Sequence, residues 1–144
     1  MNLDDDDTVD ELPARPRKEI PLEEFELLVL AARAINADFE EVDGEGYGNL
    51  HFPDGSTLPA WNSLVHKDDA LDLMVRLRFT VEVFESTIVC KGVIGMREQG
   101  TLDQHRHELA REDLGHDPNG ATCRTITRAA AQIIRGNRFL NEIS

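Results

Sequence analysis

Apolar residues at helical spacing mark the first element, which is predicted over residues 21–37. Pro21 suits the first turn of a helix, and Glu23 and Glu24 complement the positive end of the helix dipole. Apolar residues cover most of the helix circumference, so we expect this helix to pack on more than one side. They are Leu22, Phe25, Leu27, Val29, Leu30, Ala31, Ala32 and Ala34.

Two further helices are predicted from the same spacing. Residues 66–78 place acids in the first turn and arginines in the last, and their buried stripe is Ala70, Leu73, Met74 and Leu77. Residues 119–136 form the third helix, with Pro118 at its start and Asp117 or Asn119 as its cap. Gly136 is expected to end it.

Alternating apolar and polar residues predict the strands. Residues 80–84 and 87–94 form a hairpin around Glu85 and Ser86, and residues 44–55 form one or two short strands with a tight turn at 53–55. Residues 95–117 are polar and poorly periodic, and 105–108 fit either a strand or a short helix. We therefore expect an α+β fold in which three helices pack on a small, mostly antiparallel sheet of three to five strands.

Charge is distributed very unevenly along the chain. Residues 1–45 hold 15 acidic and four basic residues, which leaves only −2 of the formal net charge of −13 for residues 46–144. Residues 1–19 contain the run Asp4, Asp5, Asp6 and Asp7 and few apolar residues, so we expect a disordered acidic tail. Residues 20–140 are expected to form a single domain and residues 141–144 its C-terminal end. Such an asymmetry is typical of a partner-facing surface.

Composition also limits the classes of function. A pI near 4.7 argues against non-specific nucleic-acid binding, which needs a basic surface. No signal peptide is expected, and the longest apolar run, 27–32, is too short to cross a membrane. Cys90 and Cys123 lie in apolar segments and are expected to be buried free thiols, which predicts a cytoplasmic location.

Catalytic and metal-binding patterns are weak. His105 and His107 would share one face of a strand, but no further ligands at metal-binding spacing accompany them. Cys123 with His116 could suggest a nucleophile, yet its apolar neighbours predict a core position. We therefore expect no cofactor, no metal and no catalysis, and a small hydrolase using His105, His107 or Cys123 is the less favoured alternative.

The third predicted helix carries basic residues on one stripe. Arg124, Arg128, Arg135 and Arg138 lie within about 80° of one another, and residues 118–138 contain no acid. Three interpretations are open. The stripe is a solvated surface, it binds an anion such as a phosphate or an acidic segment, or the Asp4–Asp7 run folds back and covers it.

Two segments resemble a family of small phage proteins. Residues 61–77 (WNSLVHKDDALDLMVRL) are similar to the Trp-x-Pro-Leu…Asp-Ala…Leu stretch of NinX-like proteins and phage alpha-beta-alpha sandwich domains, and residues 117–131 (DPNGATCRTITRAAA) are similar to their closing helix. The chain departs from this pattern at Ser63, where a Pro is usual, and in its extended 95–117 region, long first helix and tail. The resemblance implies a compact sheet covered by helices and no established activity. Trp61 and Asp69 would then be either structural or part of a ligand cleft.

These observations predict a small phage- or prophage-encoded binding protein that acts in the bacterial cytoplasm on a host protein or a small anionic ligand. A more specific alternative is an inhibitor of antiviral defence. It would be either an acidic nucleic-acid mimic that uses residues 4–45 or a nucleotide sponge. The sponge would use Arg124, Arg128 and Arg135, with Trp61 or Tyr47 stacking on a base. The sequence leaves the oligomeric state open.

Overall fold

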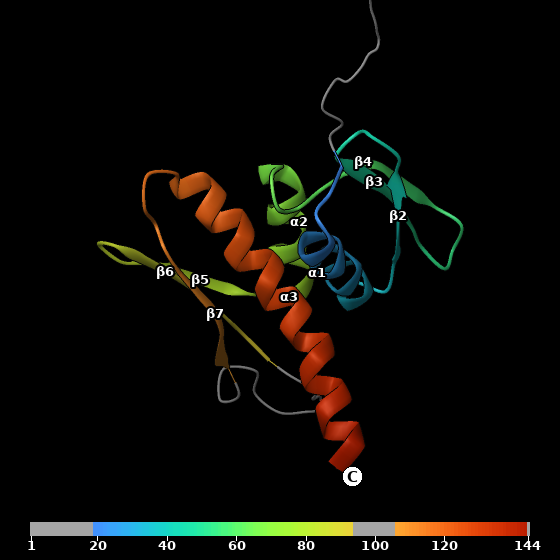
Figure 1. Ribbon diagram of the computed structural model, residues 1–144. Coiled ribbons are helices and arrows are strands. Elements are labelled where there is room, and N and C mark those ends of the chain that lie inside the picture. The colour runs from blue at the N-terminus through green and yellow to red at the C-terminus, as the bar shows by residue number, and fades with distance from the viewer. Residues whose placement is uncertain (1–18, 94–105, 144) are drawn as a thin grey trace, which may run out of the picture.

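The computed structural model describes residues 19–93 and 106–143, with side chains as far as Gly136 (Figure 1). The predicted tail lies outside this range except for its last residue. The helices are α1 (Leu22–Ala34), α2 (Lys67–Leu77) and α3 (Pro118–Ile143). The strands are β2 (Asp38–Val42), β3 (Tyr47–His51), β4 (Thr57–Trp61), β5 (Thr80–Val83), β6 (Thr87–Gly92) and β7 (His107–Asp113). The predicted α+β class with three helices is confirmed.

The described strands form two antiparallel three-stranded sheets, in the orders β2–β3–β4 and β5–β6–β7, whereas the sequence pattern predicts one sheet. The division into two sheets coincides with chain order, because α2 lies between β4 and β5 along the chain. Only β3 and the turn after it correspond to the strands predicted over 44–55. In that turn the Asp54 carboxylate accepts bonds from the Ser56 backbone N–H (2.9 Å) and hydroxyl (2.7 Å).

The second sheet contains the hairpin that the sequence predicts. β5 pairs with β6 from Thr80 opposite Lys91 to Val83 opposite Ile88, and Glu85 and Ser86 form the turn. Strand β7 is the element that the sequence left undecided between strand and helix. Its weak pattern has a structural reason, since Ala110 is its only buried residue.

Helix α3 lies at the centre of the molecule, where it contacts α1, α2, β6 and β7 (Figure 1). The predicted cap is confirmed, because the Asp117 carboxylate accepts the backbone N–H of Gly120 at 3.1 Å. The predicted end at Gly136 is wrong, since α3 continues to Ile143. A glycine inside a helix costs about 1 kcal/mol relative to alanine, which weakens a helix without ending it.

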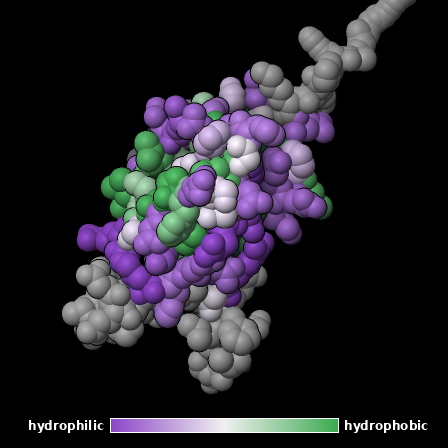
Figure 2. All heavy atoms as spheres, turned by 90° about the vertical axis from the view of Figure 1, so that its left-hand side faces the viewer, coloured by the Kyte–Doolittle hydropathy of each residue, from purple (hydrophilic) through white to green (hydrophobic). Residues whose placement is uncertain are grey.

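The core forms where α3 meets the other layers. Alanines on α3, among them Ala129 and Ala130, are fully buried and let α1 approach closely, so that Leu28 of α1 and Ile126 of α3 join one cluster with Trp61. Figure 2 looks from the side of the β5–β6 hairpin and shows hydrophobic residues gathered on that face. The large hydrophobic side chains that are exposed on α2 and the β5–β6 hairpin are Leu71, Val75, Val83 and Phe84.

Candidate functional site

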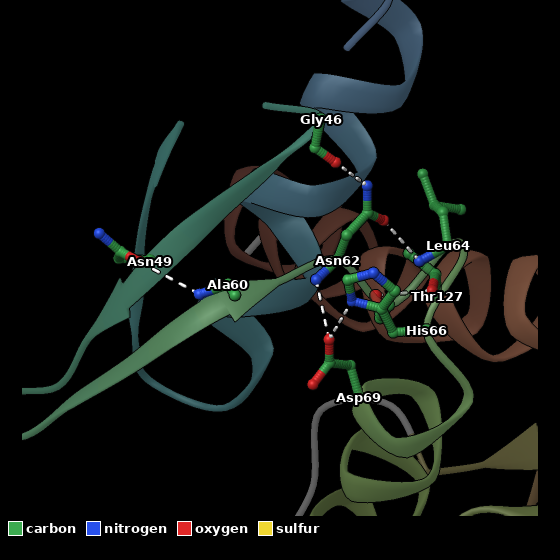
Figure 3. A network of polar contacts seen from close by, with 9 residues as sticks. Gly46, Asn49, Ala60, Asn62, Leu64, His66, Asp69 and Thr127 are labelled. Atoms are coloured by element: carbon green, nitrogen blue, oxygen red, sulfur yellow. Dashed lines mark hydrogen bonds and ion pairs between the residues drawn. The ribbon is translucent and has the colours of Figure 1, made fainter. Parts of the chain in front are cut away.

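A network of hydrogen bonds fixes the loop between β4 and α2 (Figure 3). The Asn62 amide donates to the Gly46 carbonyl (2.8 Å), and its oxygen accepts the Leu64 N–H (2.9 Å). The Asn62 N–H donates to the Asp69 carboxylate (2.9 Å), and Nδ1 of His66 lies 3.1 Å from the same oxygen. Asp69 thus ties the loop to the first turn of α2. Residues 61–77, which include this loop, are one of the two segments that resemble the phage family.

The His66–Asp69 pair has the geometry by which a carboxylate orients an imidazole in catalytic triads. Such a triad also needs an accessible nucleophile. The neighbouring hydroxyl of Ser63 is fully buried and lies 2.7 Å from the Thr127 hydroxyl, so it is bonded inside the core. These contacts join the loop to α3 and support a structural role for the network.

Trp61 lies in the core, with none of its surface exposed. Its ring meets Phe39 edge-on at a centroid distance of 5.9 Å, and Phe39 meets Phe25 of α1 in the same way. The indole N–H is buried and has no hydrogen-bond partner among the residues that the structure describes. Of the two roles that the sequence leaves open, this position matches the structural one. The ring face is not available for stacking on a base at the surface. Tyr47, the other stacking candidate, is half-buried at the start of β3.

The arginines predicted to form one stripe on α3 have different surroundings in the structure. Arg124 donates to Glu112 through Nε at 3.0 Å, and Arg128 donates to the other oxygen of Glu112 through Nη1 at 2.8 Å. Glu112 belongs to β7 and its side chain is only 15% exposed, so its carboxylate links β7 to α3. One carboxylate binds both guanidinium groups, so it offsets one of their two positive charges and gives each arginine a bound partner.

Arg135 lies apart from this pair. It lines a hollow of about 300 Å³ between α1 and α3, together with Arg33 of α1. Arg33 was not predicted as a site residue, although it is one of the four basic residues within residues 1–45. No local signal could have found it, because the two arginines belong to helices that are distant in the sequence. The side chain of Arg138 lies outside the described set.

Within residues 19–45, exposed carboxylates on α1, β2 and the turn after β2 form a negatively charged part of the surface. We call it the acidic surface: Glu23, Glu24, Glu26, Asp38 and Glu45. All five are exposed, and none has an ion pair with another described residue. A contact from the Ile20 N–H to the Glu41 carboxylate (3.4 Å) links the start of α1 to β2. Asp4, Asp5, Asp6 and Asp7 lie outside the described residues.

The two thiols are buried, as the sequence predicts. Burial raises the pKa of the Cys123 thiol, and the Asp117 carboxylate raises it further. Burial also raises the pKa of Cys90 to about 12. Both thiols are therefore protonated at neutral pH, whereas a nucleophilic cysteine needs a lowered pKa. His107 is exposed on β7, and His105 lies outside the described residues.

Within residues 19–93 and 106–143, no three His, Cys, Asp or Glu side chains are grouped closely enough to hold a metal ion. In the same ranges, no helix has the length and apolar character needed to cross a membrane. Comparison of the chain with protein-family models, curated proteins and solved structures gives no match. The resemblance to NinX-like phage proteins therefore stays a prediction.

Proposed function

We propose that this protein is a non-catalytic binding protein, encoded by a phage or prophage, that engages a cationic protein of the bacterial host in the cytoplasm. The partner contacts the acidic surface of α1 and β2. A nucleic-acid mimic that blocks a basic host defence protein is the specific form of this proposal. In that form the carboxylates occupy positions that phosphates would take on the partner.

This proposal rests on a difference between the arginines of α3 and the acidic surface. Arg124 and Arg128 are both bound to Glu112, which offsets one of their two charges, whereas the acidic surface keeps exposed carboxylates without described partners. Arg33 is the only base in residues 19–45, against nine acids. Unpaired charges of one sign create a field that steers an oppositely charged partner and speeds association. A nucleotide sponge built on Arg124, Arg128 and Trp61 loses support from the same geometry.

Two variants with the same change in net charge test whether position matters. The first carries Glu23→Gln, Glu24→Gln and Asp38→Asn on the acidic surface. The matched control carries Asp68→Asn, Glu85→Gln and Asp113→Asn, which are exposed on α2, the hairpin turn and β7. Tagged protein captures partners from host lysate at low salt, and the affinity of each purified partner is then measured against salt.

We expect a basic protein whose affinity falls at least tenfold with the acidic-surface variant and much less with the control. The salt dependence of binding should decrease with the first variant only, because fewer ion pairs form. Equal effects of the two variants would show that net charge, and not this surface, governs binding. Capture of partners that lack a basic surface would also refute the proposal. Circular dichroism checks that both variants fold.

A further inference from the structure

Arg33 and Arg135 are exposed arginines that converge on one hollow. Arg33 lies in the last turn of α1 and Arg135 on α3, and both line the 300 Å³ hollow between these helices. Neither guanidinium has an ion pair or hydrogen bond to any residue that the structure describes. Although the chain has 28 acidic and 15 basic residues, these two arginines share one hollow without a partner among the described residues. They form a local positive site in an otherwise acidic molecule.

The remaining lining gives this hollow a second character. Phe25, Val29 and Leu30 of α1 contribute apolar surface, and Glu26 is the only acidic group in the lining. The volume of this hollow matches the lower end of the range found for small-ligand sites, which combine apolar walls with a few polar groups. A ligand that suits this lining has an anionic head for the two guanidinium groups and an apolar body for the α1 surface.

A second hollow also has Arg33 in its lining. It measures about 580 Å³, and its lining includes Ile134 of α3, His51 and Phe52 at the end of β3, and Asp38 of β2. Arg33 thus borders both hollows.

We propose that Arg33 and Arg135 bind the oxyanion of a small amphipathic ligand, a phosphate monoester or a carboxylate, whose apolar part lies on Phe25, Val29 and Leu30. Guanidinium groups bind both kinds of oxyanion through charge-assisted, often paired, hydrogen bonds. Glu26 lines the smaller hollow and Asp38 the larger one, so the site borders the acidic surface, but it uses the two arginines and not the carboxylates that the proposed host partner would contact.

Isothermal titration calorimetry with two ring-bearing probes and inorganic phosphate tests this site and distinguishes the two head groups. Phenyl phosphate and phenylacetate share an apolar ring and differ in the oxyanion, and inorganic phosphate has the head alone. We expect one of the two ring-bearing probes to bind at least tenfold more tightly than inorganic phosphate. Loss of one charge-assisted bond corresponds to about tenfold or more in affinity, so Arg33→Gln and Arg135→Gln should each weaken binding by that factor.

Two matched variants complete the test. Arg78 is also exposed and has no described ion pair, but it follows α2 away from the hollow, so Arg78→Gln should leave binding unchanged. Glu26→Gln should tighten binding, because it removes the negative charge beside the oxyanion. The proposal is overturned if neither ring-bearing probe binds at millimolar concentration, if inorganic phosphate binds as tightly as both, or if Arg78→Gln weakens binding as much as Arg33→Gln. Thermal unfolding confirms that each variant is folded.

Discussion

Replacing Glu112 by glutamine should reduce stability, because one carboxylate accepts hydrogen bonds from two arginines. The side chain is 15% exposed, while those of Arg124 and Arg128 are 46% exposed, so solvent screens each ion pair in part. Exposed pairs contribute about 0.2–1 kcal/mol each, and the low exposure of Glu112 places these two in the upper half of that range. We therefore expect Glu112→Gln to lower the free energy of unfolding by about 1–2 kcal/mol. For a chain of this size the melting temperature falls by about 4–8 °C.

Urea unfolding followed by tryptophan fluorescence measures this effect directly. Trp61 is the only tryptophan of the chain and is fully buried, so its emission reports the loss of the core. Glu108→Gln is the control, because Glu108 pairs with Arg111 on β7 while both side chains are about half exposed. The control should destabilise the protein less than Glu112→Gln. Equal losses for the two variants would refute the idea that Glu112 holds β7 against α3.

Three further predictions concern the core. Trp61→Ala should lower the unfolding free energy by about 3–5 kcal/mol in urea titrations followed by circular dichroism. Trp61→Phe should cost clearly less, because the phenyl ring fills much of the cavity that alanine leaves, and equal losses would contradict this account. For the buried bond between Ser63 and Thr127, a double-mutant cycle of Ser63→Ala and Thr127→Val should give a coupling of about 1 kcal/mol, and additive losses would disprove it. The pKa of Cys90 is about 12 against a usual 9.0, so the folded thiol keeps its proton where the unfolded one loses it. The unfolding free energy should then fall between pH 9 and 12 in the native protein and less in Cys90→Ala, and identical pH profiles would oppose the assignment.

Local sequence patterns were sufficient for the elements with strong periodicity. Helices α1 and α2, the β5–β6 hairpin and the start of α3 follow from apolar spacing, turn residues and the Asp117 cap, because these signals act within a few residues. The burial of both cysteines followed from the same patterns. Strands β2 and β4 were missed and β7 was left undecided, because each of them has at most one buried residue and therefore a weak apolar pattern. Their pairing with β3 and β6 is a tertiary effect.

The site residues depended on tertiary structure for a physical reason. Periodicity places Arg124, Arg128 and Arg135 on one stripe of α3 but contains no information about what lies opposite each of them. Packing of β7 against α3 brings Glu112 to the first two, and packing of α1 brings Arg33 to the third. The interaction between charges depends on their distance in space and on their exposure to solvent. The sequence determined which charges the protein carries, whereas the fold decided which of them are neutralised and which stay available for binding.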